Sequence, residues 1–412
     1  MFALYLLIYI FLAFYFFTIR KKIDSFLFLF IGFSVYFFPL LFGKLPILSD
    51  RGFLTSEFRS IHPDFIISIV LFLFIFLVSV MLYDMKYHKK KPILNNSIYL
   101  KYDIKVFKVV KFITLSLFLI ILILTEINLS LSKTEIQNKG GYYLTAYIYS
   151  FSLYLIFSLY NKFNLNIKFD YIFIIMVLFT LLFFKQRSLV ILPIIAFLFY
   201  FKWNSYLKLR YIKYLFYIFV LLLLILLSKV FGNILFLGID YSVIELLKNL
   251  QSAFEPFTIN AVINEIYYSN FVLDSTYLTK TPLFVLPGLS SIAGIESGYF
   301  FQAYQPSVFP NVNFGLAYSP IAESFVTLGF MGIIIFSISM VGLCVIINLL
   351  FNSSNGYLQV FISLISVYLF FYIFRNSLFT AISYEKNYLY FFIFIIVISM
   401  FFKNKIILSR KV

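Results

Sequence analysis

The segment FIISIVLFLFIFLVSVMLY, from Phe65 to Tyr83, decides the fold class of this chain of 412 residues. It runs for 19 residues without a charge, and about 20 apolar residues suffice for a helix to cross the hydrocarbon core of a bilayer. Hydrophobic residues make up 62% of the chain and charged residues only 12%, about half the usual share of a soluble domain. This composition excludes a water-soluble enzyme and indicates a polytopic membrane protein.

Apolar runs of this kind recur along the whole chain. They are long and lack strict alternation, so they favour helices over the short alternating strands of a β-barrel. We therefore predict an all-α polytopic membrane protein with about 11 transmembrane helices. The predicted spans are 2–18, 25–42, 65–83, 112–129, 142–160, 171–184, 188–201, 214–230, 320–351, 357–374 and 388–402.

The distribution of charge predicts the orientation of these spans. If the basic loop 84–111 is cytoplasmic, alternate loops and the tail from Lys403 join it there, and these segments hold 21 of the 33 Lys and Arg residues but only 4 of the 17 acids. This is the positive-inside signature, and it puts the N-terminus outside the cytoplasm and the C-terminus inside. It accounts for the net charge of +16 without a nucleic-acid partner and leaves anionic membrane lipids as the expected contact.

One connection differs from all others in length. Residues 232–318 lie between the predicted helices of 1–231 and those of 319–412, and they form a single large loop on the outer side. Loops of more than about 15 residues are usually functional or disordered, and this one is too aromatic for disorder. We expect a small folded external element, with an amphipathic surface helix over 242–254 and a re-entrant or docking segment over 283–295.

No motif of a soluble enzyme is present, and the lone cysteine, Cys344, can form neither an intramolecular disulfide nor a cysteine-rich metal site. The outward-facing arginines are more informative. Arg187, in the island Lys185-Gln186-Arg187-Ser188, and Arg375, at the end of another span, lie where a lipid-linked diphosphate would present its charge. A guanidinium group binds phosphate oxygens in a bidentate manner, although both side chains could also extend to headgroups. Arg51 and Arg59 lie among acids of their own loop, which favours ordinary surface pairing.

Three other side chains are candidates for proton transfer. Glu323 lies about one turn inside a long apolar helix that begins at Pro320, where a carboxylate is stabilised by the helix N-terminus and could also deprotonate a hydroxyl group. Glu296 is flanked by glycines, and His62 precedes Pro63 near the membrane surface. An ordinary turn acid and a headgroup-level histidine are the alternatives for these two.

External aromatic residues could stack on sugar rings. The candidates are Tyr299, Tyr304 and Tyr318, although interfacial anchoring is the common role of tyrosine in membrane proteins.

The layout of the chain resembles the Wzy family of O-antigen and capsule repeat-unit polymerases. The resemblance rests on the Lys185-Gln186-Arg187-Ser188 island, on the single large loop before the antepenultimate span, and on the stretch GLAYSPIAESFVTLGFMG over 315–332 followed by a long apolar helix. In layout it covers nearly the whole chain. The Arg-x10-Gly pattern described for some members is absent after Arg187 and Arg375.

The resemblance implies a GT-C-like multispan glycosyltransferase of the bacterial inner membrane that needs no metal or other cofactor. It would polymerise undecaprenyl-diphosphate-linked repeat units on the outer face, with a chain-length regulator as a possible protein partner. Arg187 and Arg375 would stabilise the departing diphosphate, and Glu323, or else Glu296 or His62, would take or orient the proton of the attacking hydroxyl.

Two other functions stay open. An O-antigen ligase uses the same donor with a different acceptor, and hydropathy barely separates it from a polymerase. A flippase for lipid-linked oligosaccharide is the alternative among transporters, which often show repeated halves, whereas no internal repeat is evident in this chain.

Overall fold

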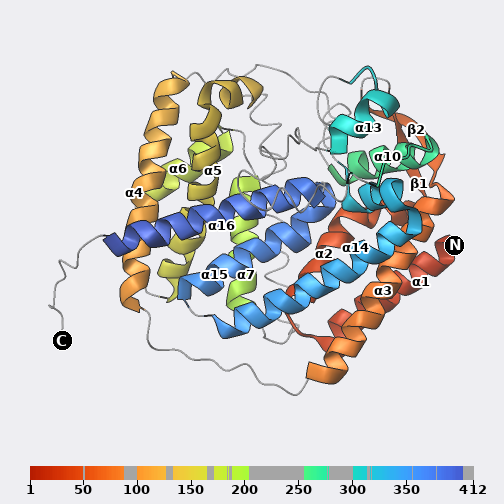
Figure 1. Cartoon of the computed structure of the whole chain (residues 1–412), viewed down its shortest axis with the longest axis horizontal. Helices are drawn as coiled ribbons and strands as arrows, with labels where there is room; N and C mark the ends of the chain where they lie inside the picture. Colours follow the sequence, from red (N-terminus) through yellow and green to blue (C-terminus); the bar gives the residue numbers. More distant parts are fainter. Residues whose placement is uncertain are drawn as a thin grey trace. The chain divides into compact units, whose positions relative to one another are not determined.

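The computed structural model describes residues 1–49, 52–87, 100–126, 133–164, 171–182, 184, 188–203, 255–275, 277, 300–312, 316, 318–354, 356–376 and 378–401 (Figure 1). The chain divides into two compact units. Unit 1 comprises 1–94, 198–353 and 362–385, and unit 2 comprises 95–197, 354–361 and 386–412.

The prediction of a multi-pass helical membrane protein is confirmed. Eight helical segments in the described part of the chain are long and apolar enough to cross a bilayer: 2–20, 25–42, 63–86, 105–124, 135–162, 320–353, 356–375 and 380–401. Two further predicted spans correspond to the shorter apolar helices α6 (Tyr171–Leu182) and α7 (Ser188–Lys202). The predicted span 214–230, the surface helix 242–254 and the segment 283–295 lie outside the described residues.

Unit 1 is built on three packed helices. They are α2 (Ser25–Phe37), α3 (Pro63–Tyr87) and α14 (Pro320–Ser353), with α1 (Phe2–Phe14) packed against α3. Three phenylalanine rings meet in the core: Phe72 stacks on Phe336 with centroids 5.8 Å apart, and Phe374 packs edge-on to Phe72 at 5.8 Å. Phe374 belongs to the irregular continuation of α15 (Gly356–Ser366), which consists of a π-helix, η5 (Val367–Tyr372), and a 3₁₀ turn, η6 (Ile373–Arg375). Gly32 of α2 lies against this segment so closely that an added Cβ would collide with the carbonyl group of Phe370.

A buried ion-pair network fastens one end of this bundle. Arg20 ends the π-helical continuation of α1, η1 (Tyr15–Arg20), and forms two hydrogen bonds with the carboxylate of Asp24, at 2.8 and 2.6 Å. Its Nε donates to Asp84 of α3 at 2.7 Å, and the Tyr15 hydroxyl donates to the same oxygen at 2.8 Å. Arg20 and Asp24 are both buried, and each has an opposite charge within hydrogen-bond distance, which offsets the cost of removing it from water.

A small cap lies at the other end of the bundle. It contains an antiparallel hairpin, β1 (Lys44–Leu48) and β2 (Leu54–Ser60), and the helix α10 (Glu255–Tyr268), which packs against β1 (Figure 1). The hairpin is the one departure from helix among the described elements, and the all-α prediction missed it. It falls in the loop between the second and third predicted spans, where the chain is too short and too polar to give a membrane-spanning signal.

Two buried asparagines and a tyrosine attach α10 to the rest of unit 1. Asn260 donates to the carbonyl of Tyr36 at 2.6 Å, and Asn264 donates to the carbonyl of Ser60 at 3.2 Å. Tyr267 donates to Ser68 of α3 at 2.9 Å and stacks on Phe325 of α14 with centroids 4.4 Å apart. Because these contacts reach α2, the hairpin, α3 and α14, the helix fixes the cap on the bundle.

A second short helix, α13 (Phe300–Val308), completes the cap. Its Gln305 side chain donates to the carbonyl of Val312 at 2.8 Å and accepts from the amide of Leu316 at 3.3 Å. These two hydrogen bonds hold Val312 and Leu316 against α13.

Unit 2 is a separate helical assembly. It contains α4 (Leu100–Leu124), α5 (Lys133–Asn164), α6, most of α7, the first part of α15 and the later part of α16 (Leu378–Phe401). The helices α4 and α5 pack along each other. Tyr357 donates to Asn161 at 2.6 Å and stacks on Phe157 at 4.3 Å, so α15 and α5 are joined by both polar and aromatic contacts.

Candidate functional site

Glu323 is a buried carboxylate near the start of α14. Its residue is fully buried, and its Oε2 accepts a hydrogen bond from the backbone N–H of Leu378, the first residue of α16, at 2.7 Å. Oε1 makes no hydrogen bond within the described part of the chain. A carboxylate that caps a helix needs only one oxygen for that task, so the second is available to a hydroxyl group or a proton.

Tyr277 faces this carboxyl group from the segment that follows α10. Burial, together with the negative charge of Glu323, raises the pKa of the Tyr277 hydroxyl well above its usual value. The hydroxyl therefore keeps its proton and acts as a hydrogen-bond donor toward the carboxylate.

The segment that carries Tyr277 is attached to α14 close to a kink in that helix. Gly329 has φ 60° and ψ −146°, a conformation that is nearly exclusive to glycine, and it breaks the helix between two straight parts. The carbonyl of Val326, one turn before the break, accepts from the amide of Leu273 at 2.9 Å. The segment after α10 is thus attached to α14 beside the kink. Tyr277 follows four residues after Leu273, and its backbone amide donates to the backbone carbonyl of Asp274 at 2.9 Å.

Arg375 lies three residues before Leu378, whose backbone amide donates to Glu323. Its guanidinium donates to the hydroxyl of Tyr372, and its central carbon lies 5.1 Å from the centroid of the same ring. The following residue, Asn376, donates through its side chain to the carbonyl of Tyr372 at 3.1 Å, which fixes the turn between η6 and α16. Arg375 and Glu323 therefore belong to the same end of unit 1.

His62 lies at the start of α3, where it caps the helix. Its Nδ1 accepts from the amide of Asp64 at 3.2 Å, and its own amide donates to Asn264 at 2.8 Å. With Nδ1 in use as an acceptor, the neutral ring carries its proton on Nε2. This arrangement gives His62 a structural task, and its role as a base stays a prediction.

Tyr304 and Tyr318 pack in an aromatic cluster within the cap. Their ring centroids are 5.7 Å apart, and Phe300 lies 5.0 Å from Tyr304 and 5.2 Å from Tyr318. The Tyr304 hydroxyl donates to the carbonyl of Leu316 at 3.2 Å. Both residues are buried, so these rings stabilise the cap, and their stacking on a sugar stays a prediction.

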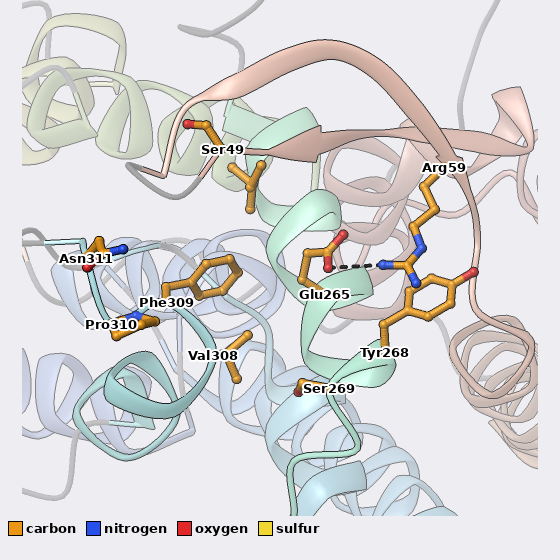
Figure 2. Close-up of a pocket in the computed structure, with 10 residues that line it drawn as sticks. Ser49, Arg59, Glu265, Tyr268, Ser269, Val308, Phe309, Pro310 and Asn311 are labelled. Atoms are coloured by element: carbon orange, nitrogen blue, oxygen red, sulfur yellow. Dashed lines mark hydrogen bonds and ion pairs between the residues drawn. The ribbon is translucent and has the colours of Figure 1, made fainter.

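An open pocket lies beside this cluster, between the hairpin, α10 and the turn after α13 (Figure 2). Its volume is ≈ 310 Å³, and its lining includes Arg59, Glu265 and Tyr268. Arg59 donates to Glu265 at 3.3 Å, and its guanidinium carbon lies 3.2 Å from the centroid of the Tyr268 ring. The predicted surface pairing of Arg59 is confirmed, but its partner comes from α10 and not from its own loop.

The remaining predicted site residues, Arg187, Glu296 and Tyr299, lie outside the described residues. Among the described residues, no group of three or more His, Cys, Asp or Glu side chains is placed to hold a metal ion.

Three residues of interest are absent from the sequence-based candidates. Tyr277 and Glu265 acquire their roles only through partners far away in sequence. Glu385 of α16 is the third: both carboxylate oxygens are buried, and neither has a hydrogen-bond partner in the described part of the chain. Its position in a charged patch, Glu385-Lys386-Asn387, within an apolar run was the available signal.

Comparisons with protein-family models, with curated proteins and with solved structures give no match to this chain.

Proposed function

We propose that this protein is a membrane glycosyltransferase that polymerises undecaprenyl-diphosphate-linked repeat units on the outer face of a bacterial inner membrane. The observation that carries the proposal is the environment of Glu323. One oxygen of this buried carboxylate accepts from the Leu378 amide, and the other, Oε1, has no hydrogen-bond partner among the described residues. The Tyr277 hydroxyl faces the same carboxyl group. Buried charged groups without full hydrogen bonding are costly and concentrate at functional sites.

The proposed reaction joins two lipid-linked glycans. A hydroxyl oxygen of the acceptor sugar attacks the anomeric carbon of the donor, and the bond between that carbon and the diphosphate breaks. The diphosphate leaves with the electron pair, and the proton of the hydroxyl passes to Glu323. Tyr277 holds the carboxylate in place, and Arg375, with the predicted contribution of Arg187, stabilises the charge of the leaving group.

The cap supports this proposal by its position. The hairpin, α10 and α13 lie at the same end of α3 and α14 as Glu323, opposite the Arg20 network, and we propose that this end receives the two glycans (Figure 1). Holding two reactants in a productive geometry supplies several kcal/mol of barrier lowering, typically about 7 to 11 kcal/mol in well-oriented cases.

The test separates a chemical from a structural role of Glu323. Glu323→Gln keeps an oxygen that accepts from Leu378 and loses the negative charge. We expect the variant to reach the membrane at the normal level and to lose the polysaccharide ladder on a gel, because an amide cannot accept the proton. The matched control is Glu57→Gln, an exposed acid of β2 that lies outside the site. A normal ladder with Glu323→Gln would leave the carboxylate with a capping role only.

Deletion of the gene distinguishes the polymerase from its alternatives. A lipid core that carries a single repeat unit, with no ladder of longer chains, would support a polymerase. Loss of all polymer from the lipid core while it accumulates on its lipid carrier would instead support a ligase, and loss of repeat units from the outer face would support a flippase.

A further inference from the structure

We propose that the pocket between the hairpin and α10 is a glycan-binding subsite that takes a neutral sugar. The inference rests on the proposed function only in assigning that sugar to a lipid-linked repeat unit. Three separate parts of the chain line the pocket, and all of the residues named below belong to the part of the chain that the structure describes. They come from the hairpin, from α10, and from the end of α13 and the turn after it. Its volume of ≈ 310 Å³ lies at the lower end of the usual range for ligand pockets, about 300 to 1,000 Å³, which suits one or two sugar rings.

The charge of the lining selects a neutral ligand. Among the described residues of the lining, Arg59 and Glu265 carry a charge, and these two charges cancel at a separation of 3.3 Å. The other lining residues are Leu48, Ser49, Tyr268, Ser269, Val308, Phe309, Pro310 and Asn311. A phosphate or carboxylate that approached Arg59 would meet the Glu265 carboxylate as well, whereas a neutral hydroxyl group would not be repelled.

The ion pair offers a donor and an acceptor side by side. Arg59 has five N–H donors, of which one is used by Glu265, and the carboxylate of Glu265 keeps acceptor sites beyond that bond. The side chain of Arg59 is 41% exposed and that of Glu265 is 21% exposed, so a ligand can reach both. Since each sugar hydroxyl both donates and accepts, two adjacent hydroxyls match this pair.

The geometry of the pair is fixed before any ligand binds. The guanidinium carbon of Arg59 lies 3.2 Å from the centroid of the Tyr268 ring, and the hydroxyl of Tyr268 donates to the carbonyl of Ser60 at 3.2 Å. A side chain that is already ordered loses little entropy on binding.

An apolar wall faces the ion pair. In Figure 2, Phe309 and Pro310 lie on the side of the pocket away from Arg59 and Tyr268, with Glu265 between them, and Asn311 lies at the rim beside Pro310. A pyranose ring has apolar C–H groups on its faces and hydroxyls around its edge. It would place the face on Phe309 and Pro310 and direct the edge toward Arg59, Glu265 and the polar groups of Ser49, Ser269 and Asn311.

The test is a binding measurement on the full chain in lipid nanodiscs. The probes are the methyl glycosides of glucose, galactose and N-acetylglucosamine, with glucuronic acid and inorganic phosphate as anionic probes, all observed by ligand-based NMR. We expect at least one neutral glycoside to bind and both anions to bind more weakly. Arg59→Ala and Glu265→Gln should weaken that binding about tenfold, because the first removes a charged donor and the second replaces a charged acceptor with a weaker neutral one. Glu57→Gln, on the same strand as Arg59, should bind like the unaltered protein.

A second variant keeps the test independent of the ion pair. Asn311→Leu narrows the pocket at an exposed position and leaves Arg59, Glu265 and Tyr268 in place, so it should also weaken binding while thermal stability stays unchanged. Absence of binding by every neutral probe, binding that all three pocket variants leave unaffected, or preferential binding of phosphate or glucuronic acid would each overturn the inference.

The readouts separate this inference from the proposed function. Glu323→Gln should bind the neutral glycoside normally although it makes no ladder. If the protein binds sugar but deletion of its gene leaves the ladder intact, the polymerase proposal is refuted and the sugar-binding subsite stands. If the ladder depends on Glu323 but no sugar binds in the pocket, the subsite is refuted and the polymerase proposal stands.

Discussion

Replacing Arg20 with alanine should destabilise the protein more than any single change at its surface. The side chain of Arg20 is fully buried, and the substitution removes its hydrogen bonds to Asp24 and Asp84 at 2.6 to 2.8 Å. It leaves Asp24 buried with its negative charge uncompensated. Breaking a buried ion pair in this way costs about 3 to 5 kcal/mol.

The magnitude can be measured as a shift in Tm of the purified protein in detergent. A loss of 3 to 5 kcal/mol corresponds to about 6 to 20 °C in domains of 150 to 250 residues, and this longer chain should show a shift near the lower end. Arg20→Lys keeps the charge but loses the planar guanidinium group, so its Tm should lie between those of the unaltered protein and the Arg20→Ala variant. The double variant Arg20→Ala with Asp24→Ala should be more stable than Arg20→Ala alone, because the orphaned carboxylate is then absent.

The outcome that would refute this reasoning is an Arg20→Ala protein with an unchanged Tm. It would mean that the network does not fasten α1, α2 and α3 together, and that water reaches Asp24 and Asp84 without cost. A double variant that is less stable than Arg20→Ala would likewise contradict the idea that an unpaired charge dominates the loss.

Three further predictions concern the bundle and the site. Gly329→Ala should lower the free energy of unfolding, measured by chemical denaturation, by about 1 to 3 kcal/mol, because only glycine adopts this backbone conformation without strain. The matched control is Gly342→Ala in the same helix, where no atom lies within 4 Å of the added Cβ. Gly32→Val should reduce the amount of folded protein in the membrane, measured by size-exclusion chromatography, because the side chain would collide with the backbone at Phe370; normal yield would contradict the close approach of α2 and η5. Arg375→Ala should abolish the ladder while Arg375→Lys retains part of it, and a normal ladder in both variants would show that the guanidinium group does not bind diphosphate.

Hydropathy could predict most of the helices because membrane insertion depends on composition over about 20 residues, which is a local property. It could not predict the hairpin: β1 and β2 have five and seven residues, and their pairing depends on a cross-strand register, such as Leu45 opposite Arg59, that no local average contains.

The candidate site was partly predictable for the same physical reason. Glu323 was found because a carboxylate inside an apolar helix is conspicuous in the sequence. Its contact with the amide of Leu378 spans 55 residues, and the pairing of Arg59 with Glu265 spans 206 residues. Such long-range partners depend on the tertiary fold, so Tyr277 and Glu265 could not be predicted from their neighbours in the chain.

The discontinuous origin of the pocket bears on how this protein can be re-engineered. Because Arg59 comes from the hairpin and Glu265 from a segment two hundred residues later, a chimera that exchanges only residues 232–318 would separate a guanidinium group from the carboxylate that accompanies it. If the pocket binds sugar as proposed, an exchange of sugar preference requires that residues 44–60 are transferred together with residues 232–318. Side-chain contacts within the cap therefore decide which residues must be exchanged together, and these residues are not contiguous in the sequence.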